Sequence, residues 1–480
     1  MVRARWLSRF ARATALSAGA CMVVLLLAAA PGYASINASV AKVGPQNGGG
    51  EPSIAFGPEG NAYVSYPASP GPLFYRSFNG GLTWGPGQTV ATSSGDTTVN
   101  VDRTGAVYES NLNSNLQIDL YKSLDAGKTF PQKGTSLDTM DSTSQPFLVD
   151  RQWTDAYVPP GSNTGHGRVY IQYHDFAPSQ VWVASSTDGG KTFGTPVDVL
   201  AGSPQAEAAS FCNSIPGGLK VVKSGPHAGR IYVAWLGADL ATNVATGCNL
   251  TQLNTFHSVW VASSDDGGAT WTSHLVFDGG IGHDASALFA DLTLDNQGNP
   301  YVAFGDNLDN EWDMWVQASF DGGVSWNGST GGTGAPYKVN ADTGTHFFPA
   351  ITAGDPGKVD VSYLGTPTKI STLPYGKPAP GGGAGASWYV YAAQSLNLLS
   401  GHPTWAVTRV TPQPMHVGDV CTLGLFCTVF PSANRNLLDF IDAALDKAGR
   451  THISFTQDTT PQNSGIYVAN QTGGTTVGHP

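Results

Sequence analysis

The feature that most constrains this chain is a short segment that recurs with a fixed internal order at irregular spacing. The clearest copy reads SSDDGGATW at residues 263–271. Related segments read SFNGGLTW, SLDAGKTF, SSTDGGKTF and SFDGGVSW at residues 77–84, 123–130, 185–193 and 319–326. We call these five segments the repeat turns. A local order that is kept at loose spacing indicates a structural unit repeated along the chain.

Each residue type in the repeat turns has a separate physical role. The Asp accepts hydrogen bonds from backbone amides just ahead of it, and the glycines adopt the positive φ angles of a tight hairpin. The closing Trp or Phe begins the outgoing strand and is large enough to pack between neighbouring sheets. The repeat turns therefore predict β-hairpins, because the same Asp repeated along a chain cannot face one substrate.

A second pattern, strand–turn–strand, accompanies the repeat turns and occurs seven times. EPSIAFGPEGNAYVSY at residues 51–66 is its first copy, with alternating apolar and polar residues on both sides of a Gly-containing turn. The last copy, at residues 436–455, contains a stretch with helical character. We interpret its DKAGR as the same turn, because THISF follows in the place of AYVSY.

The predicted fold class is all-β: a single β-propeller of seven four-stranded blades, with six or eight blades as alternatives. The sixth unit carries only a degenerate repeat turn at residues 395–405, and the seventh ends at residues 465–474 without a fourth strand. INASVAKV at residues 36–43 is a lone strand, so we expect the N-terminus to complete the last blade. Closing the ring removes sheet edges that would otherwise invite aggregation.

The first residues predict the cellular compartment. Residues 1–34 combine arginines without acids, a short apolar run and small residues before the end, which predicts a secretory signal peptide cleaved after Ala34. A membrane anchor is the alternative, but the apolar run is too short to span a bilayer. The propeller is then expected at residues 35–480. Losing the four arginines of the signal takes the formal net charge from −11 to −15, which disfavours nucleic acid and membrane partners. We expect a monomer.

Four cysteines remain after the signal peptide: Cys212, Cys248, Cys421 and Cys427. An even count in an oxidising compartment suggests two disulfides, for which three pairings exist. Proximity in sequence favours Cys212–Cys248 and Cys421–Cys427. The spacing does not suit a structural zinc site.

The repeat turns resemble the Asp-box, or BNR repeat, of the bacterial neuraminidase (sialidase) superfamily, and the resemblance covers most of the mature chain. It implies an Asp-box propeller. It does not imply one activity, because the box occurs in sialidases, other glycosidases and non-enzymatic propellers.

A sialidase of this superfamily would hold its substrate's carboxylate with three arginines, the first in an Arg-Ile-Pro motif at the start of blade one. This chain has GGEPSI there, with Glu51 and no arginine. We place Arg151 in or beside a blade's first turn, on the face of the repeat turns, and only Arg435 on the opposite face. Exo-sialidase activity is therefore disfavoured.

In such a blade the chain runs outward from the axis. The starts of the inner strands and the loops between the second and third strands then share the face opposite the repeat turns, which we call the mouth face. Loops that converge near the axis are the default ligand site. The predicted mouth residues are Glu51, Asp96, Gln145, Asn213, Asp284, His346 and Arg435 at strand starts, and Tyr66, Glu109, His174, Asp175, Trp235, Asp239, Asp306, Asn307, Asp309, Glu311, Tyr363 and Asp458 on loops.

These residues predict a secreted, sialidase-like propeller that recognises extracellular carbohydrate, and a glycoside hydrolase if two mouth carboxyls flank the scissile bond. The candidate catalytic residues are Glu51, Glu109, His174, Asp175, Asp306 and Tyr363. The candidate substrate-binding residues are Tyr66, Trp235, His346 and Arg435. The alternative is a non-catalytic propeller whose acidic face binds a protein or a cation. A polysaccharide lyase that uses the pair Tyr173 and His174 is a further, less favoured alternative.

The segment GDNLDNEWD at residues 305–313 gathers oxygen ligands on a short loop, a pattern that suits calcium. Asp306, Asp309 and Glu311 are the candidate ligands. The segment lacks the spacing and central Gly of an EF-hand, so a solvated acidic loop is the alternative. No other cofactor is expected.

Overall fold

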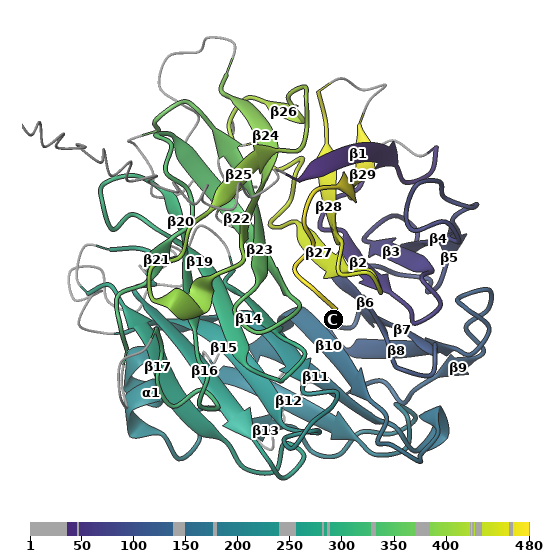
Figure 1. Ribbon diagram of the computed structural model, residues 1–480. Coiled ribbons are helices and arrows are strands. Elements are labelled where there is room, and N and C mark those ends of the chain that lie inside the picture. The colour runs from purple at the N-terminus through teal and green to yellow at the C-terminus, as the bar shows by residue number, and fades with distance from the viewer. Residues whose placement is uncertain are drawn as a thin grey trace, which may run out of the picture. The chain divides into compact units, whose positions relative to one another are not determined.

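Seven four-stranded patterns in the sequence fold into seven antiparallel sheets that ring a common axis, as Figure 1 shows. The structure is a computed structural model. It describes residues 36–479 except 46–47, 138–148, 176–179, 240–255, 281–282, 286–288, 328–332, 371–384, 423, 425–426, 428–433 and 460–463. The prediction of an all-β, seven-bladed propeller is confirmed.

The first four blades follow the chain in order from the inner strand outward. Their strands are β2 (Ser53–Phe56), β3 (Ala62–Tyr66), β4 (Leu73–Ser77) and β5 (Gln88–Thr89) in blade 1; β6 (Thr97–Val101), β7 (Val107–Leu112), β8 (Ile118–Ser123) and β9 (Gln132–Lys133) in blade 2; β10 (Val149–Tyr157), β11 (Arg168–Asp175), β12 (Gln180–Ser186) and β13 (Val197–Asp198) in blade 3; and β14 (Asn213–Val221), β15 (Ile231–Ala238), β16 (Ser258–Ser264) and β17 (Thr272–Asp278) in blade 4.

The remaining blades include the one that closes the ring. Their strands are β18 (Asp291–Leu294), β19 (Pro300–Asp306), β20 (Asp313–Ala318) and β21 (Tyr337–Lys338) in blade 5; β22 (Thr345–Ala353), β23 (Val359–Thr366), β24 (Ser387–Ser395), β25 (Ala406–Arg409) and β26 (His416–Val417) in blade 6; and β27 (Asp442–Leu445), β28 (Thr451–Gln457), β29 (Gly465–Gly473) and β1 (Asn37–Lys42) in blade 7. The described helical segments are short: α1 (Pro204–Ala209), η1 (Thr164–His166) and η2 (Leu398–Ser400).

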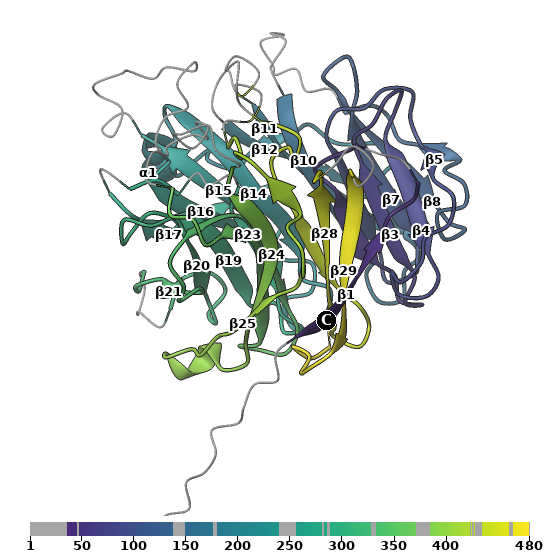
Figure 2. The same ribbon diagram turned by 90° about the horizontal axis from the view of Figure 1, so that it is seen from above.

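The N-terminal strand closes the ring as the sequence predicts. β1 pairs antiparallel with β29, and Figures 1 and 2 both show the purple β1 beside the yellow β29. The stretch with helical character forms β27 instead, and β27 pairs with β28. Its amphipathic spacing is outweighed by its place in the sheet, where backbone pairing and contacts with the next inner strand hold it extended.

The repeat turns share one network of local hydrogen bonds. In the copy of blade 4, the Ser264 hydroxyl donates to Asp266 Oδ1 (2.8 Å) and accepts from the Gly268 amide (2.9 Å). Asp266 Oδ1 also accepts from the Thr270 amide (2.9 Å). Asp125, Asp188 and Asp321 occupy the same position in blades 2, 3 and 5. Each turn is therefore held by its own residues.

Asparagine takes the place of the Asp in two blades. In blade 1, Asn79 accepts from the Thr83 amide (2.9 Å). In the degenerate turn of blade 6, Asn397 accepts from the Thr404 amide (2.9 Å), across an insertion that forms η2. The sixth unit therefore keeps a turn of the same kind, because an amide oxygen accepts the bond as well as a carboxylate oxygen does.

The core lies between neighbouring sheets, and polar contacts join the inner strands. Phe130, at the end of the blade 2 repeat turn, packs edge-on against Phe74 of blade 1 with ring centroids 5.0 Å apart. Around the axis, Asp442 Oδ2 accepts from the Ile54 amide of the next blade (2.9 Å). Inner strands from all seven blades enclose a central channel of about 280 Å³.

Within the described part of the chain, no helix is long and apolar enough to cross a membrane. Cys421 and Cys427 form the predicted disulfide. Cys212 is also disulfide-bonded. Its predicted partner, Cys248, lies outside the described residues, as does the predicted signal peptide at residues 1–34.

Candidate functional site

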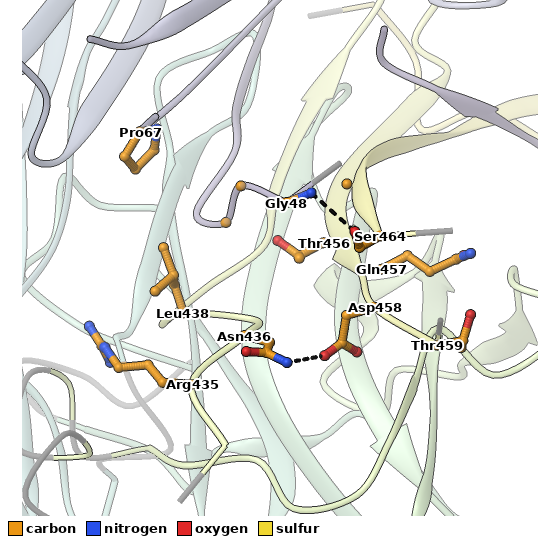
Figure 3. A pocket seen from close by; sticks show the side chains of 13 residues that line it. Gly48, Pro67, Arg435, Asn436, Leu438, Thr456, Gln457, Asp458, Thr459 and Ser464 are labelled. Atoms are coloured by element: carbon orange, nitrogen blue, oxygen red, sulfur yellow. Dashed lines mark hydrogen bonds between the residues drawn. The ribbon is translucent and has the colours of Figure 1, made fainter. Parts of the chain in front are cut away.

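A cavity of about 580 Å³ opens on the mouth face where blade 7 meets blade 1 (Figure 3). Its volume falls within the range of about 300–1,000 Å³ that is typical of small-molecule sites. Most of its side chains are neutral hydrogen-bonding groups, with apolar contacts from a proline and a leucine. The lining residues are Gly48, Gly49, Gly50, Pro67, Arg435, Asn436, Leu438, Thr456, Gln457, Asp458, Thr459, Ser464 and Gly465.

Asp458 is the carboxylate in the cavity wall, and two neighbours hold it in place. Its Oδ1 lies 2.5 Å from His416 Nδ1, and its Oδ2 accepts from the Asn436 side-chain amide (2.8 Å; Figure 3). His416 Nε2 lies 2.9 Å from the Asp419 carbonyl oxygen, so both ring nitrogens have polar neighbours that orient the imidazole. Burial opposes ionisation of Asp458, but the hydrogen bond from His416 outweighs it and lowers the pKa of Asp458.

Arg435 also lines the cavity, but its guanidinium is already paired. Its two terminal nitrogens donate to the two carboxylate oxygens of Asp439, at 2.5 and 2.7 Å. The two side chains are 18% and 9% exposed, so the pair is largely shielded from solvent. A bidentate arginine–carboxylate pair of this kind fixes both partners.

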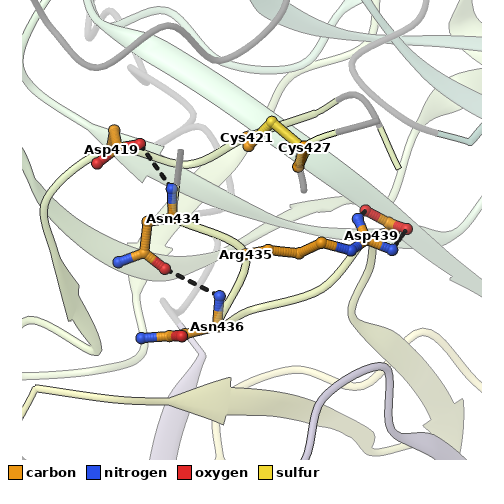
Figure 4. Close-up of a disulfide and its surroundings, with 7 residues drawn as sticks. All are labelled: Asp419, Cys421, Cys427, Asn434, Arg435, Asn436 and Asp439. Atoms are coloured by element: carbon orange, nitrogen blue, oxygen red, sulfur yellow. Dashed lines mark hydrogen bonds and ion pairs between the residues drawn. A yellow bond between two sulfur atoms is a disulfide. The ribbon is translucent and has the colours of Figure 1, made fainter. Parts of the chain in front are cut away.

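The segment that carries Arg435 is anchored by the disulfide loop, as Figure 4 shows. Asp419 Oδ2 accepts from the Asn434 amide (2.9 Å), and the Cys421 amide donates to the Asn434 carbonyl (3.2 Å). The bond between Cys421 and Cys427 ties this loop to itself. The cavity wall therefore rests on a covalently closed loop between blades 6 and 7.

Another part of the cavity wall consists of Gly49 and Gly50, because neighbouring side chains leave no room there for a Cβ atom. Gly49 has φ +94°, and a Cβ on it would lie 2.7 Å from the Tyr66 ring. A Cβ on Gly50 would lie 2.5 Å from Leu438. Tyr66, a predicted substrate-binding residue, is thus buried behind the wall and stacks on Tyr75 at 5.9 Å.

Glu51 follows this wall directly and belongs to a cluster of charges near the axis. It is 5% exposed. Burial, then the charges of Asp96 and Asp439, raise the pKa of Glu51 well above its usual value, while Arg151 and Arg435 act in the opposite direction. Low dielectric and nearby carboxylates both favour the protonated form.

Arg151 and three aromatic rings close the mouth end of the channel. The Arg151 guanidinium carbon lies 4.7 Å from the Trp153 ring centroid and 3.9 Å from that of Phe440. Phe289 packs edge-on against Trp153 at 5.3 Å. We call Arg151, Trp153, Phe289 and Phe440 the plug. The channel and the mouth cavity share no lining residue.

The sequence-based position of Arg151 is wrong. We placed it near a first turn on the face of the repeat turns, but β10 extends from Val149 to Tyr157, and Arg151 lies at its mouth end. A register shift between Asp150 and Gln152, together with φ +49° at Arg151, makes the strand longer than the repeat pattern indicates. Arg151 and Arg435 are the two arginines of this cluster, and three would be needed for the clamp of a sialidase.

Strained backbone marks the mouth ends of several inner strands. Non-glycine residues with φ between +48° and +57° recur there, a conformation that is uncommon for such residues. They are Glu51, Arg151, Phe289, Phe348 and Leu438. Such strain concentrates at functional sites, and here it surrounds the cavity wall and the plug.

Several candidate catalytic residues lie inside the blades, away from the cavity. Glu109 is fully buried in β7 and accepts from the Ser65 hydroxyl of blade 1 (3.3 Å). His174 is 2% exposed, and burial lowers its pKa to about 3. Tyr363 is fully buried and stacks on Tyr391 at 5.5 Å. Gln145 and the side chain of Asp175 lie outside the described residues.

Two candidate substrate-binding residues are equally buried. The Trp235 indole nitrogen donates to the Ser210 hydroxyl (3.0 Å). His346 is enclosed by Asp313 (3.2 Å) and Asp342 (3.4 Å). Burial lowers the pKa of His346, but the hydrogen bonds with these carboxylates outweigh it and raise it to about 9. Of the four residues proposed to bind substrate, Arg435 is the one in the cavity wall.

In the acidic segment between β19 and β20 of blade 5, one carboxyl is buried and two others pair with lysines. Asp306 is fully buried near Asp284, and burial first, then Asp284, raise the pKa of Asp306 to about 8. Asp309 pairs with Lys338 (2.5 Å), and Glu311 pairs with Lys369 (2.9 Å). Among the described residues, no three His, Cys, Asp or Glu side chains already form a group that could hold a metal ion. The calcium site at Asp306, Asp309 and Glu311 stays a prediction.

The sequence interpretation missed most of the groups that fix the cavity. Asn436, Asp439 and His416 do not appear among the predicted mouth residues, whereas Arg435 and Asp458 do. The three missed residues lie in the long insertion between β25 and β27, which is outside the repeat pattern. An insertion that contains a closely spaced cysteine pair was the signal that could have pointed to them.

No family model matches the chain. Several solved structures are similar to the chain at low sequence identity. A polysaccharide lyase of family PL25, an ulvan lyase bound to -[GlcA(1-4)Rha3S]-, has a TM-score of 0.50 and 15% identity over 91% of this chain and 97% of its own. A protein of unknown function from Dyadobacter fermentans has 0.46 and 14%, over 92% and 99%. The intramolecular trans-sialidase of Ruminococcus gnavus has 0.40 and 12%, over 92% and 98%. At these identities the likeness shows the fold alone.

Proposed function

We propose that this protein is a secreted propeller that binds extracellular carbohydrate in the mouth cavity between blades 7 and 1. The observation that carries the proposal is the cavity wall, where neutral hydrogen-bonding side chains surround a carboxylate held by His416 and Asn436. Sugars present many hydroxyls, each a donor and an acceptor, so fixed polar groups bind them well. Pro67 and Leu438 offer apolar contact to the C–H face of a sugar ring.

Two further features support this proposal. The predicted signal peptide and the disulfides suit an extracellular protein. The ulvan lyase, a propeller of similar fold, was solved with a saccharide bound.

A glycoside hydrolase is the second candidate, and Glu51 favours it. Hydrolysis needs one carboxyl that keeps its proton to donate to the leaving oxygen and a second that is ionised. The raised pKa of Glu51 suits the first role, and Asp96, whose charge contributes to that shift, is the nearby carboxyl for the second.

Screening the secreted protein against an oligosaccharide panel, with both retention and release of new reducing ends measured, separates the candidates. Binding without cleavage supports the carbohydrate-binding propeller. Cleavage that is lost in Glu51→Gln, while binding is kept, supports the hydrolase. If no member of the panel binds with a Kd below about 1 mM, a standard free energy near −4 kcal/mol, the proposed function is wrong.

A further inference from the structure

The charged groups of the cavity wall are already neutralised by partners from the protein itself. Both terminal nitrogens of Arg435 donate hydrogen bonds to Asp439, and Asp458 is hydrogen-bonded to His416. The other polar side chains of the wall are neutral amides and hydroxyls. Among the residues that the structure describes, the cavity therefore presents no guanidinium or ammonium group that is ready to receive an anion.

An anionic ligand would have to break one of these pairs. Taking Arg435 from Asp439 would leave a carboxylate that is 9% exposed without its partner, which is costly in a poorly solvated place. Glu51 lies near the same guanidinium, and the chain as a whole carries a formal net charge of −11. Both the local and the long-range fields thus oppose a carboxylated or sulfated sugar.

Asp458 suits a pair of neighbouring hydroxyl groups instead. A carboxylate has about four lone-pair positions, and the bonds from His416 and Asn436 use two of them, one on each oxygen. Because these bonds fix the carboxylate plane, the remaining positions are preorganised to accept from two donors side by side. Two hydroxyls on adjacent ring carbons of a sugar provide that arrangement.

We propose that the cavity between blades 7 and 1 selects uncharged saccharides and binds them through adjacent hydroxyls that donate to Asp458. This inference rests on the proposed function and names the class of ligand within it. This selectivity would distinguish the protein from propellers that bind acidic sugars. The cavity offers a hydrogen-bond acceptor, the Asp458 carboxylate, whereas an acidic sugar needs an unpaired cation.

The test is a comparison of matched neutral and acidic probes by isothermal titration. Galactan oligosaccharides are compared with galacturonan oligosaccharides of the same length, and lactose with sialyllactose, within a wider panel of neutral oligosaccharides. We expect the best neutral probe to bind at least about tenfold more tightly than any acidic one. Its Kd should hardly change between about 0.01 and 1 M salt, because salt screens only charged contacts.

Two variants identify the site. Asp458→Asn keeps the shape but removes charge and one acceptor, and should weaken neutral binding about tenfold to a hundredfold. Asn436→Ala releases the carboxylate without adding a charge, and should weaken binding less. Asp278→Asn is the matched control, since Asp278 also pairs with a histidine, His257 (2.7 Å), but does not line this cavity, and it should bind as the parent does. Thermal melts establish that each variant is folded.

The outcomes are distinct. Tighter binding of an acidic probe that is lost in Asp458→Asn overturns the inference while the proposed function stands. Neutral binding that is unchanged in both folded variants also overturns it, because the sugar then lies elsewhere. Failure of every probe to bind overturns the proposed function itself, and this inference with it.

Discussion

The repeat turns and the mouth cavity use aspartate in opposite ways. Asp266 of a repeat turn is exposed, and its partners Ser264, Ala269 and Thr270 lie within four residues of it. Asp458 of the cavity is half-buried, and its partners lie 42 and 22 residues away along the chain. The first aspartate stabilises a turn that any blade can reuse. The second joins the loop after β28 to the insertion between β25 and β27, which occurs once, and so it suits a specific ligand.

Protonation separates the repeat turns from two other carboxyls of the mouth face, Asp306 and Glu51. Hydrogen bonds from the Thr270 hydroxyl and then from its amide lower the pKa of Asp266 to about 2, which keeps it ionised. Burial raises the pKa of Asp306 to about 8 and that of Glu51 well above its usual value. Turn carboxylates therefore stabilise the fold when charged, whereas the buried mouth carboxyls are more stable when neutral.

The largest expected effect tests this opposition through pH. Asp306 has a folded pKa of about 8 and an unfolded pKa near 3.9, so the folded state keeps a proton that the unfolded state releases. Stability should fall as pH rises between these values, by up to about 1.4 kcal/mol per pH unit. Asp306→Asn should flatten this slope in chemical denaturation at pH 5 and pH 8. An unchanged slope would contradict the buried, protonated state of Asp306.

The next largest effect concerns the pair that holds the cavity wall. Arg435→Met should destabilise the protein by about 3 kcal/mol, because it leaves the Asp439 carboxylate shielded and unpaired. The double variant Arg435→Met with Asp439→Leu should recover most of the loss. Urea denaturation measures both. Equal stability of the single and double variants would mean that the pair is solvated and does not fix the wall.

Removing the disulfide of the insertion should have a smaller effect. Cys421 and Cys427 are six residues apart, and closing so short a loop stabilises by about 2 kcal/mol in the chain-entropy model. The variant with both cysteines replaced by serine should lose about that much stability and bind the best saccharide more weakly, since Asn434 leans on this loop. A loss of stability with unchanged binding would show that the loop does not position the wall.

The smallest effect belongs to a single repeat turn. Asp266→Ala should cost about 1 kcal/mol, because the turn is exposed and its hydrogen bonds compete with water. Asp266→Asn keeps an acceptor oxygen, as Asn79 does in blade 1, and should cost less. Neither variant should change saccharide binding. A loss of saccharide binding in either variant would contradict the claim that the repeat turns stabilise the fold without contributing to the ligand site.

The fold was largely predictable because it depends on short-range patterns. The order Ser, Asp or Asn, Gly, and Thr or Ser in the repeat turns fixes a local network, and alternation fixes the strands on either side. The lone strand at residues 36–43 and the missing fourth strand of the last blade together predicted ring closure by the N-terminus. The pairing of β1 with β29 confirms it. Alignment of DKAGR and THISF with the other repeats also decided correctly against a helix at β27.

The site was predictable only in part, because its contacts depend on where the pattern breaks. Arg435 and Asp458 were placed on the mouth face from the repeat alignment, and both line the cavity. Arg151 was misplaced because a register shift near Gln152 lengthens β10. Glu109 and Tyr363 were taken for mouth residues, yet at strand positions so near the loops a shift of one residue turns a side chain from the mouth to the blade interior.

The central claim is that the cavity between blades 7 and 1 holds the sugar, and a crystal structure with the tightest neutral oligosaccharide tests it most directly. The account predicts a sugar ring between Gly49 and Asn436, with adjacent hydroxyls within hydrogen-bonding distance of both Asp458 oxygens and Arg435 still paired with Asp439. A sugar bound instead beside Asp306, or one whose acidic group has displaced Asp439 from Arg435, would contradict it.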